Sequence, residues 1–333
     1  QMSLTSEVVR RTFKASDDKR DKGLKTPEDI ERFDDIVYGE NEKWNLLDVY
    51  RSKKEAGKKL PVIVSVHGGG WVYGTKETYQ FYCMDLAERG FAVVNFSYRL
   101  APEYKFPAPL EDTNKVISWI LDHKKEYQFD TEHIYMVGDS AGGNTLALYA
   151  AICTNPKYAK NFAFKVPDHF KPKAIALNCG TYDQEMEKGE QKKGLMADYL
   201  PEKGTKKEID LINPMLHLDE NYPPVFLMTA TGDFLIDQAT MMAGTLTKHK
   251  VPFLYRFYGD AKTELGHVVC FFQFNHCIHE CFRDILTTVN AEASVWIRHN
   301  VSSFLTAATN AAIFSLSFLL SVSMPELTST AKG

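Results

Sequence analysis

Short runs of consecutive apolar residues recur along the first 260 residues, and segments with helical spacing separate them. Strands that are apolar throughout must be buried on both faces, which is typical of a parallel sheet covered by helices. The pattern therefore predicts an α/β fold with a mostly parallel central sheet and helices on both faces. The expected strands are Leu46–Tyr50, Leu60–Val66, Phe91–Tyr98, His133–Val137, Lys173–Asn178, Val225–Ala230 and Pro252–Tyr258, and the expected helices are Tyr79–Arg89, Leu110–Lys124 and Asn144–Cys153.

Two segments interrupt this alternation. Residues 4–35 hold charged, helix-compatible segments that are broken at Thr26-Pro27, and residues 181–222 are rich in Lys, Glu and Gly. An insertion at the carboxyl edge of a sheet can cover a site there. We expect a small helical lid from 1–35 and 181–222, with a plain long connection as the alternative for 181–222. Residues 1–290 are predicted to form a single domain, and 291–333 a tail of unknown structure.

A G-x-S-x-G segment, Gly138-Asp139-Ser140-Ala141-Gly142, lies between a predicted strand and a predicted helix. Small flanking residues let the backbone fold into a tight, strained turn that exposes the serine at a helix N-terminus. The dipole of that helix favours developing negative charge. The motif predicts Ser140 as a nucleophile; a structural glycine-rich turn is the alternative.

The segment His67-Gly68-Gly69-Gly70-Trp71 follows the predicted strand Leu60–Val66. Backbone N–H groups can approach a negatively charged oxygen closely only where no side chain intervenes. The glycines satisfy that requirement, and the residue after the nucleophile, Ala141, supplies a further amide. We predict an oxyanion hole here.

These motifs, together with Tyr98-Arg99-Leu100-Ala101-Pro102-Glu103, resemble the hormone-sensitive-lipase-like branch of the α/β-hydrolases, which includes bacterial carboxylesterases and acetyl esterases. The resemblance covers roughly residues 36–267. It implies the α/β-hydrolase fold with a lid built from N-terminal helices and an insertion. It also implies that the oxyanion amides belong to Gly69, Gly70 and Ala141, and that His67 supports the loop.

The acid and base of a triad should follow the nucleophile in the order acid, then histidine. Asp233 directly follows an apolar strand and matches the first aspartate of the family's D-x-L-x-D segment, with Asp237 as the alternative. His267 follows the next strand and is the predicted base. His249, His276 and His279 are the other histidines of this part of the chain that we considered.

Composition is that of an ordinary globular protein, with 44% apolar and 25% charged residues. A net charge of −4 gives no sign of nucleic-acid binding. The polar start of the sequence holds no secretory apolar run, so we expect a cytoplasmic location. Six cysteines in 333 residues are not a disulfide framework. A homo-oligomer is compatible with the sequence.

The resemblance ends just after His267. Cys270, Cys277 and Cys281, with the nearby histidines, match no familiar zinc spacing, and no metal is expected. Val301–Met324 is uncharged and long enough to span a bilayer, but its eight Ser or Thr residues argue against a membrane anchor. A packed helix, a disordered tail and an altered reading frame are the alternatives.

The sequence thus predicts a cofactor-free serine carboxylesterase that hydrolyses short-chain, acetyl-type esters through an acyl-enzyme. Trp71 and Tyr73 are expected to line the substrate pocket, although Trp71 could equally belong to the core. One alternative function is amide hydrolysis of the arylformamidase type. Another is a non-catalytic member of the fold that binds a small ligand.

Overall fold

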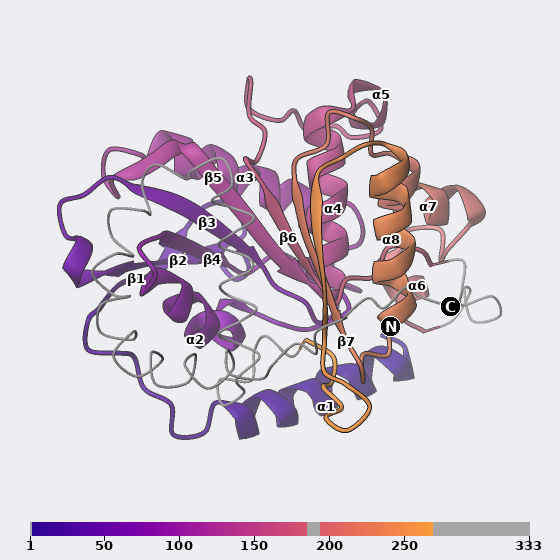
Figure 1. Ribbon diagram of the computed structural model, residues 1–333, viewed down its shortest axis with the longest axis horizontal. Helices are drawn as coiled ribbons and strands as arrows, with labels where there is room; N and C mark the ends of the chain where they lie inside the picture. Colours follow the sequence, from indigo (N-terminus) through magenta and orange to yellow (C-terminus); the bar gives the residue numbers. More distant parts are fainter. Residues whose placement is uncertain (1, 185–193, 269–333) are drawn as a thin grey trace, which may run out of the picture. The chain divides into compact units, whose positions relative to one another are not determined.

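A computed structural model describes residues 2–184 and 194–268 of the chain. Its centre is an eight-stranded sheet in the order β1-β2-β4-β3-β5-β6-β7-β8 (Figure 1). The β1–β2 and β2–β4 pairs are antiparallel, and every other pair is parallel. The strands are β1 (Ile30–Val37), β2 (Leu46–Ser52), β3 (Leu60–Val66), β4 (Ala92–Phe96), β5 (Phe129–Asp139), β6 (Ile175–Asn178), β7 (Val225–Ala230) and β8 (Phe253–Tyr258).

Helices cover both faces of this sheet, as the apolar strands require. They are α1 (Leu4–Arg20), α2 (Lys76–Ala87), α3 (Ala108–Asp122), α4 (Ser140–Thr154), α5 (Pro156–Ala159), α6 (Leu195–Tyr199), α7 (Lys206–Leu211) and α8 (Ile236–Lys248), with short 3-10 turns at Lys53–Glu55 and Pro214–Leu216. None of the helices within these described ranges is long and apolar enough to cross a bilayer.

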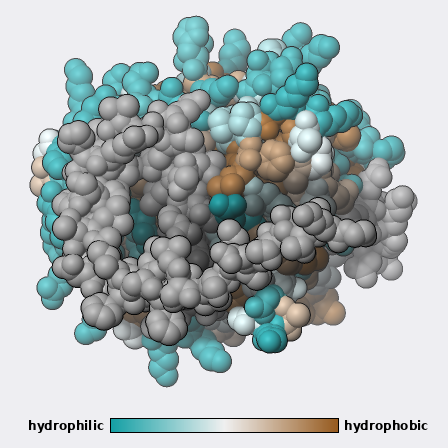
Figure 2. All heavy atoms as spheres, viewed as in Figure 1, coloured by the Kyte–Doolittle hydropathy of each residue, from teal (hydrophilic) through white to brown (hydrophobic). Residues whose placement is uncertain are grey.

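Alternation along the strands divides the core into two clusters. In β3, Val62 and Val64 join the cluster that packs against α3, α4 and α8, whereas Ile63 between them joins the cluster that packs against α2. Successive side chains of a strand point to opposite faces, so one strand supplies both layers. Because both faces of an inner strand are buried in one cluster or the other, such a strand is apolar at successive positions. On the face shown in Figure 2, hydrophilic residues gather along the upper edge and apolar residues lie nearer the middle.

The prediction of a mostly parallel sheet is confirmed, and β3 and β7 have the predicted bounds. The interpretation of residues 4–35 as helical was wrong for its last part. That part forms β1, which pairs with β2 at the edge of the sheet. Most of β1 is solvent-accessible and carries charged residues, so it lacks the apolar run that marked the inner strands.

The described residues, 2–184 and 194–268, all belong to one compact unit. The segment predicted as an insertion, 181–222, holds α6, α7 and a 3-10 turn, with residues 185–193 outside the described part. The predicted tail, 291–333, also lies outside the described residues, so the division of the chain into domains stays a prediction.

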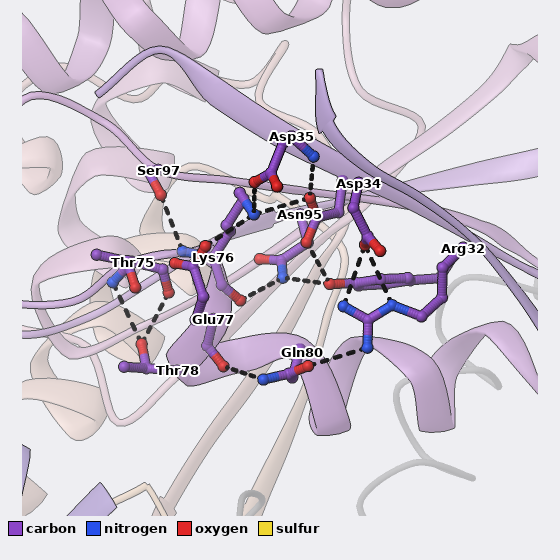
Figure 3. Close-up of polar contacts among 12 residues, drawn as sticks. Arg32, Asp34, Asp35, Thr75, Lys76, Glu77, Thr78, Gln80, Asn95 and Ser97 are labelled. Carbon is purple, nitrogen blue, oxygen red and sulfur yellow. Dashed lines mark hydrogen bonds and ion pairs between the residues drawn. The ribbon is translucent and has the colours of Figure 1, made fainter. Parts of the chain in front are cut away.

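The start of α2 is fixed to the sheet by a buried lysine (Figure 3). The ammonium of Lys76, whose side chain is only 4% exposed, lies 2.9 Å from the buried carboxylate of Asp48 on β2 and 2.7 Å from both Asp35 and Glu77. The backbone N–H of Lys76 donates to Ser97, and its carbonyl accepts from Asn95. Burial favours the neutral amine, but the hydrogen bonds to the three carboxylates outweigh it and raise the pKa of Lys76.

We expect Lys76→Met to lower the free energy of unfolding by about 3–5 kcal/mol, because it leaves Asp48 buried without a counter-charge. The loss should shrink as the pH is lowered, because a protonated Asp48 no longer needs a counter-charge and burial already raises the pKa of this carboxyl. Urea unfolding at two pH values measures both effects. Asp35→Asn, which removes a carboxylate that is 72% exposed, is the control and should cost less than about 1 kcal/mol. Equal losses in the two variants would contradict this account.

Candidate active site

Four loops that carry predicted site residues leave the sheet at its carboxyl edge. The glycine-rich loop follows β3 and Ser140 follows β5, which is the neighbour of β3. Asp233 follows β7 and His267 follows β8, which pair with each other. Neighbouring parallel strands end at the same edge, so these residues converge although up to 200 positions separate them.

Ser140 sits on a strained turn between β5 and α4. Its φ of +49° is in the left-handed region that side-chain-bearing residues rarely adopt. The turn packs against the glycine-rich loop so tightly that a Cβ on Gly142 would overlap the carbonyl oxygens of Val66 and His67. Glycine at 142 is therefore a packing requirement of the two loops, as the G-x-S-x-G motif predicted.

Asp233 and His267 form a short hydrogen bond. The Nδ1 of His267 lies 2.6 Å from Oδ1 of Asp233. The carboxylate is 3% exposed and also accepts hydrogen bonds from the hydroxyl of Thr229 and the backbone N–H of Leu235. Burial pushes the pKa of Asp233 up, but the bonds from His267 and Thr229 outweigh burial and hold that pKa below its usual value. The acid is thus kept ionised beside the histidine.

A cavity of about 150 Å³ has both Ser140, the predicted nucleophile, and His267 in its wall. Ser140, His267, Gly68, Gly69 and Tyr73 all line it. Trp71 does not: it is 1% exposed, stacks on Tyr199 at 4.4 Å between ring centroids, and belongs to the core. Tyr73 therefore lines this cavity, and its contact with substrate stays a prediction, whereas Trp71 belongs to the core, the alternative that the sequence left open.

The glycine-rich loop offers two backbone amides. Gly69 and Gly70 both have positive φ, +107° and +61°. Within the described part of the chain, neither amide N–H donates to a protein acceptor. The carbonyl of Gly69 accepts from Val72 and Tyr73 and so belongs to a closed turn. Ala141, the third predicted donor, lies in the first turn of α4. The amides of Gly69 and Gly70 are therefore not used within the described part of the protein, and their role as an oxyanion hole stays a prediction.

His67 lies beneath this loop in a neutral state. Its Nδ1 lies 2.8 Å from the carbonyl oxygen of Gly68, and its ring stacks on Tyr98 with a centroid distance of 3.9 Å. Burial lowers the pKa of His67 to about 4. The hydroxyl of Tyr98 donates to the carbonyl oxygen of His67 at 2.9 Å. These contacts agree with the supporting part that the resemblance implied.

Helix α1 closes one wall of the cavity. Phe13, Ser16, Asp17 and Arg20 of this helix all line it. Tyr73 donates to Asp17 at 2.8 Å, and Arg20 donates to the carbonyl oxygen of Thr78 at 2.7 Å. Residues 1–35 were predicted as part of a lid, but the sequence carried no signal for these particular side chains.

Helix α1 is held at its other positions too. Arg10 donates to the carbonyl oxygens of Val72 and Ala101, both at 2.8 Å. Ser3 donates to Asp198 of α6, which belongs to the predicted insertion. The two segments predicted to form a lid are therefore joined to each other.

Three further residues of the site were not singled out by sequence reasoning. Asp139, which precedes Ser140, and Tyr79 line the cavity, and the hydroxyl of Tyr79 donates to Asp139 at 2.8 Å. Burial raises the pKa of Asp139 to about 7, although hydrogen bonds from Tyr79 and Gly68 oppose it. Tyr79 was assigned only to a helix, and nothing in the sequence marked its hydroxyl.

Cys179 is the third such residue. Its sulfur lies within 4.8 Å of ligand-type atoms of Asp233 and His267, so these three side chains could in principle hold a metal ion. Burial and the charge of Asp233 raise the pKa of the Cys179 thiol well above its usual value. A thiol that stays protonated is a hydrogen-bond donor to the carboxylate, and it is a poor ligand for zinc.

The other candidates lie elsewhere. Asp237 lies in the first turn of α8, and His249 caps the end of that helix. His276 and His279, with Cys270, Cys277, Cys281 and Val301–Met324, fall outside the described residues. Asp233 and His267 are therefore the carboxylate and imidazole that the described residues bring together beside Ser140.

The BD-FAE family model matches residues 47–245, more than half of the chain. The chain belongs to the BD-FAE family. The predicted membership of the hormone-sensitive-lipase-like branch of the α/β-hydrolases is confirmed. Among the solved structures that this BD-FAE family member resembles is an esterase of Pyrobaculum calidifontis, with a TM-score of 0.67, 26% identity, and coverage of 87% of this chain and 92% of that one. Esterase B of Lactobacillus rhamnosis has the same fold, with a TM-score of 0.77, 24% identity, and coverage of 86% and 93%.

Curated relatives of this BD-FAE family member include esterases. An esterase of Gibberella moniliformis is 30% identical over 57% of this chain and 62% of its own length. The versiconal hemiacetal acetate esterase of Dothistroma septosporum is 29% identical over 63% of this chain and 67% of its own length. The match thus spans about two thirds or less of these relatives.

We expect Asp139 to make the stability of this BD-FAE family member depend on pH. Its folded-state pKa lies above that of an unfolded Asp, so the folded state binds more protons between about pH 4 and the folded pKa of about 7. The contribution of Asp139 to the free energy of unfolding is therefore largest at the acid end of this window and falls as pH rises. As pH rises through this window, the free energy of unfolding of Asp139→Asn should increase relative to that of the wild type. Urea unfolding at several pH values measures this, and parallel profiles would contradict it.

Proposed function

We propose that the chain is a serine carboxylesterase that hydrolyses short-chain carboxylic esters through an acyl-enzyme. One observation carries the proposal: His267 hydrogen-bonds Asp233 at 2.6 Å and lines the same small cavity as Ser140. The esterases among the relatives support the reaction class. No cofactor enters this chemistry.

Ser140 Oγ attacks the ester carbonyl carbon, and Nε2 of His267 accepts the hydroxyl proton. Asp233 holds Nδ1 and so fixes the tautomer in which Nε2 is bare and basic. The carbonyl π electrons move to oxygen, and the resulting oxyanion is received by the amides of Gly69, Gly70 and Ala141. One such donor typically contributes about 3–4 kcal/mol to the transition state.

Collapse of this tetrahedral intermediate breaks the bond to the alcohol, which leaves with the proton returned by His267. Water then attacks the acyl-enzyme and gives up a proton to the same nitrogen. The carboxylic acid departs, and Ser140 regains its proton. The imidazole thus acts as base and as acid within each half-reaction.

The size of the cavity supports a short acyl group. Its volume of about 150 Å³ is below the roughly 300 Å³ at the lower end of ordinary ligand pockets. The hydrogen bond between Tyr73 and Asp17 holds α1 across it. The cytoplasmic location and the homo-oligomer stay predictions.

We expect Ser140→Ala to lower kcat for p-nitrophenyl acetate by about 10⁴-fold or more, because the nucleophile is lost while the fold stays intact. The matched control is Ser118→Ala. Ser118 bonds to the carbonyl oxygen of Asn114 within α3, so its loss should leave kcat within about twofold.

Unchanged hydrolysis by Ser140→Ala would overturn the esterase proposal. Assaying a formanilide-type amide beside the ester distinguishes a carboxylesterase from an arylformamidase-type amide hydrolase. Preference of the wild type for the amide would favour the arylformamidase alternative. A wild type that binds the ester without cleaving it would favour the non-catalytic alternative.

A further inference from the structure

One hydroxyl joins the two loops that carry the proposed chemistry. Tyr79, on the first turns of α2, accepts a hydrogen bond from the backbone N–H of Gly68 at 2.8 Å. The same hydroxyl donates to Oδ2 of Asp139 at 2.8 Å. Gly68 directly precedes Gly69 of the glycine-rich loop, and Asp139 directly precedes Ser140. The contacts of Tyr79 therefore end one residue away from an oxyanion donor and one residue away from the nucleophile.

The two bonds of Tyr79 are directional and shielded from water. Asp139 is 3% exposed, and a Cβ on Gly68 would overlap its carboxylate and crowd the hydroxyl of Tyr79. Hydrogen bonds in such a low-dielectric place are stronger than in water and polarise one another. The N–H of Gly68 therefore has the hydroxyl of Tyr79 as its acceptor, whereas the amides of Gly69 and Gly70 lack a protein acceptor among the described residues.

Helix α2 provides a rigid base for this hydroxyl. Lys76, one turn before Tyr79, is fixed on the sheet through its side chain and through both of its backbone polar groups (Figure 3). The position of Tyr79 is therefore set by β2 and β4 and not by the loop that it holds. Tyr98 donates to the carbonyl oxygen of His67, the residue before Gly68.

We propose that Tyr79 is a positioning residue that sets the distance between the oxyanion amides and Ser140. The role rests on the proposed function, because it concerns the same transition state. Without the hydroxyl, Gly68 and Asp139 each lose a partner. The direct bond from Gly68 to Asp139 then remains without the support of Tyr79, and the glycine-rich loop can shift relative to the serine turn. Oxyanion stabilisation falls even though the three catalytic side chains are intact.

The test is Tyr79→Phe, which keeps the ring and removes only the hydroxyl. We expect kcat for p-nitrophenyl acetate to fall about tenfold with KM within about twofold, because the amides act on the transition state and not on the bound ester. The matched control is Tyr222→Phe. Tyr222 is buried and donates to the carbonyl oxygen of Ala147 in α4 at 2.8 Å, but it does not line the cavity.

A second readout separates positioning from a merely structural role. A trifluoromethyl ketone forms a tetrahedral adduct with a serine nucleophile, and its oxyanion occupies the same amides. Its affinity should fall in Tyr79→Phe by the same factor as kcat/KM, and it should not change in Tyr222→Phe. Hydrogen exchange at the Gly68 amide should become faster only in Tyr79→Phe.

An active wild type with an equally active Tyr79→Phe variant would overturn the role of Tyr79 and leave the esterase proposal standing. Equal losses of kcat in Tyr79→Phe and Tyr222→Phe would also overturn it, since the effect would then follow stability. A wild type without esterase activity would overturn the proposed function and this role together.

Discussion

The site depends on the direct backbone contact between the loops that follow β3 and β5. These strands are parallel neighbours, so their carboxyl ends lie side by side. The serine turn approaches the glycine-rich loop until Gly142 lies against the carbonyl oxygens of Val66 and His67. A side chain at that point would move Ser140 away from the amides of the glycine-rich loop. The strained φ of Ser140 is kept because the packed loops leave the turn no other conformation.

Buried polar groups hold this contact in register. Lys76 and Asp48 fix α2 to the sheet, and Tyr79 extends from α2 to both loops. An ion pair as buried as Lys76 with Asp48 adds little net stability, but breaking it is costly. The ion pair instead fixes the position of α2, and Tyr79 in the following turn of that helix contacts both loops of the site. Hydrogen bonds also offset burial at Asp233. Burial disfavours ionisation of this carboxyl, and three hydrogen bonds to the carboxylate outweigh that effect.

Features encoded by neighbouring residues could be predicted from the sequence. The apolar runs of β3 and β7 marked buried strands, and the glycine motifs marked the serine turn and the loop. Asp233 and His267 were predicted from strand order and from resemblance, and the structure brings them to hydrogen-bond distance. Features made by distant segments were not predicted. The edge strand β1 has no apolar run, and the side chains of α1 reach the cavity only through tertiary packing.

The central claim is that Ser140 is the nucleophile of a catalytic triad with His267 and Asp233. The most direct test is covalent labelling with a fluorophosphonate, followed by intact mass and peptide mapping. The account predicts one adduct per chain, located on Ser140, with labelling slowed greatly in His267→Ala and absent in Ser140→Ala. Labelling that persists in Ser140→Ala, or that proceeds at the wild-type rate without His267, would contradict it.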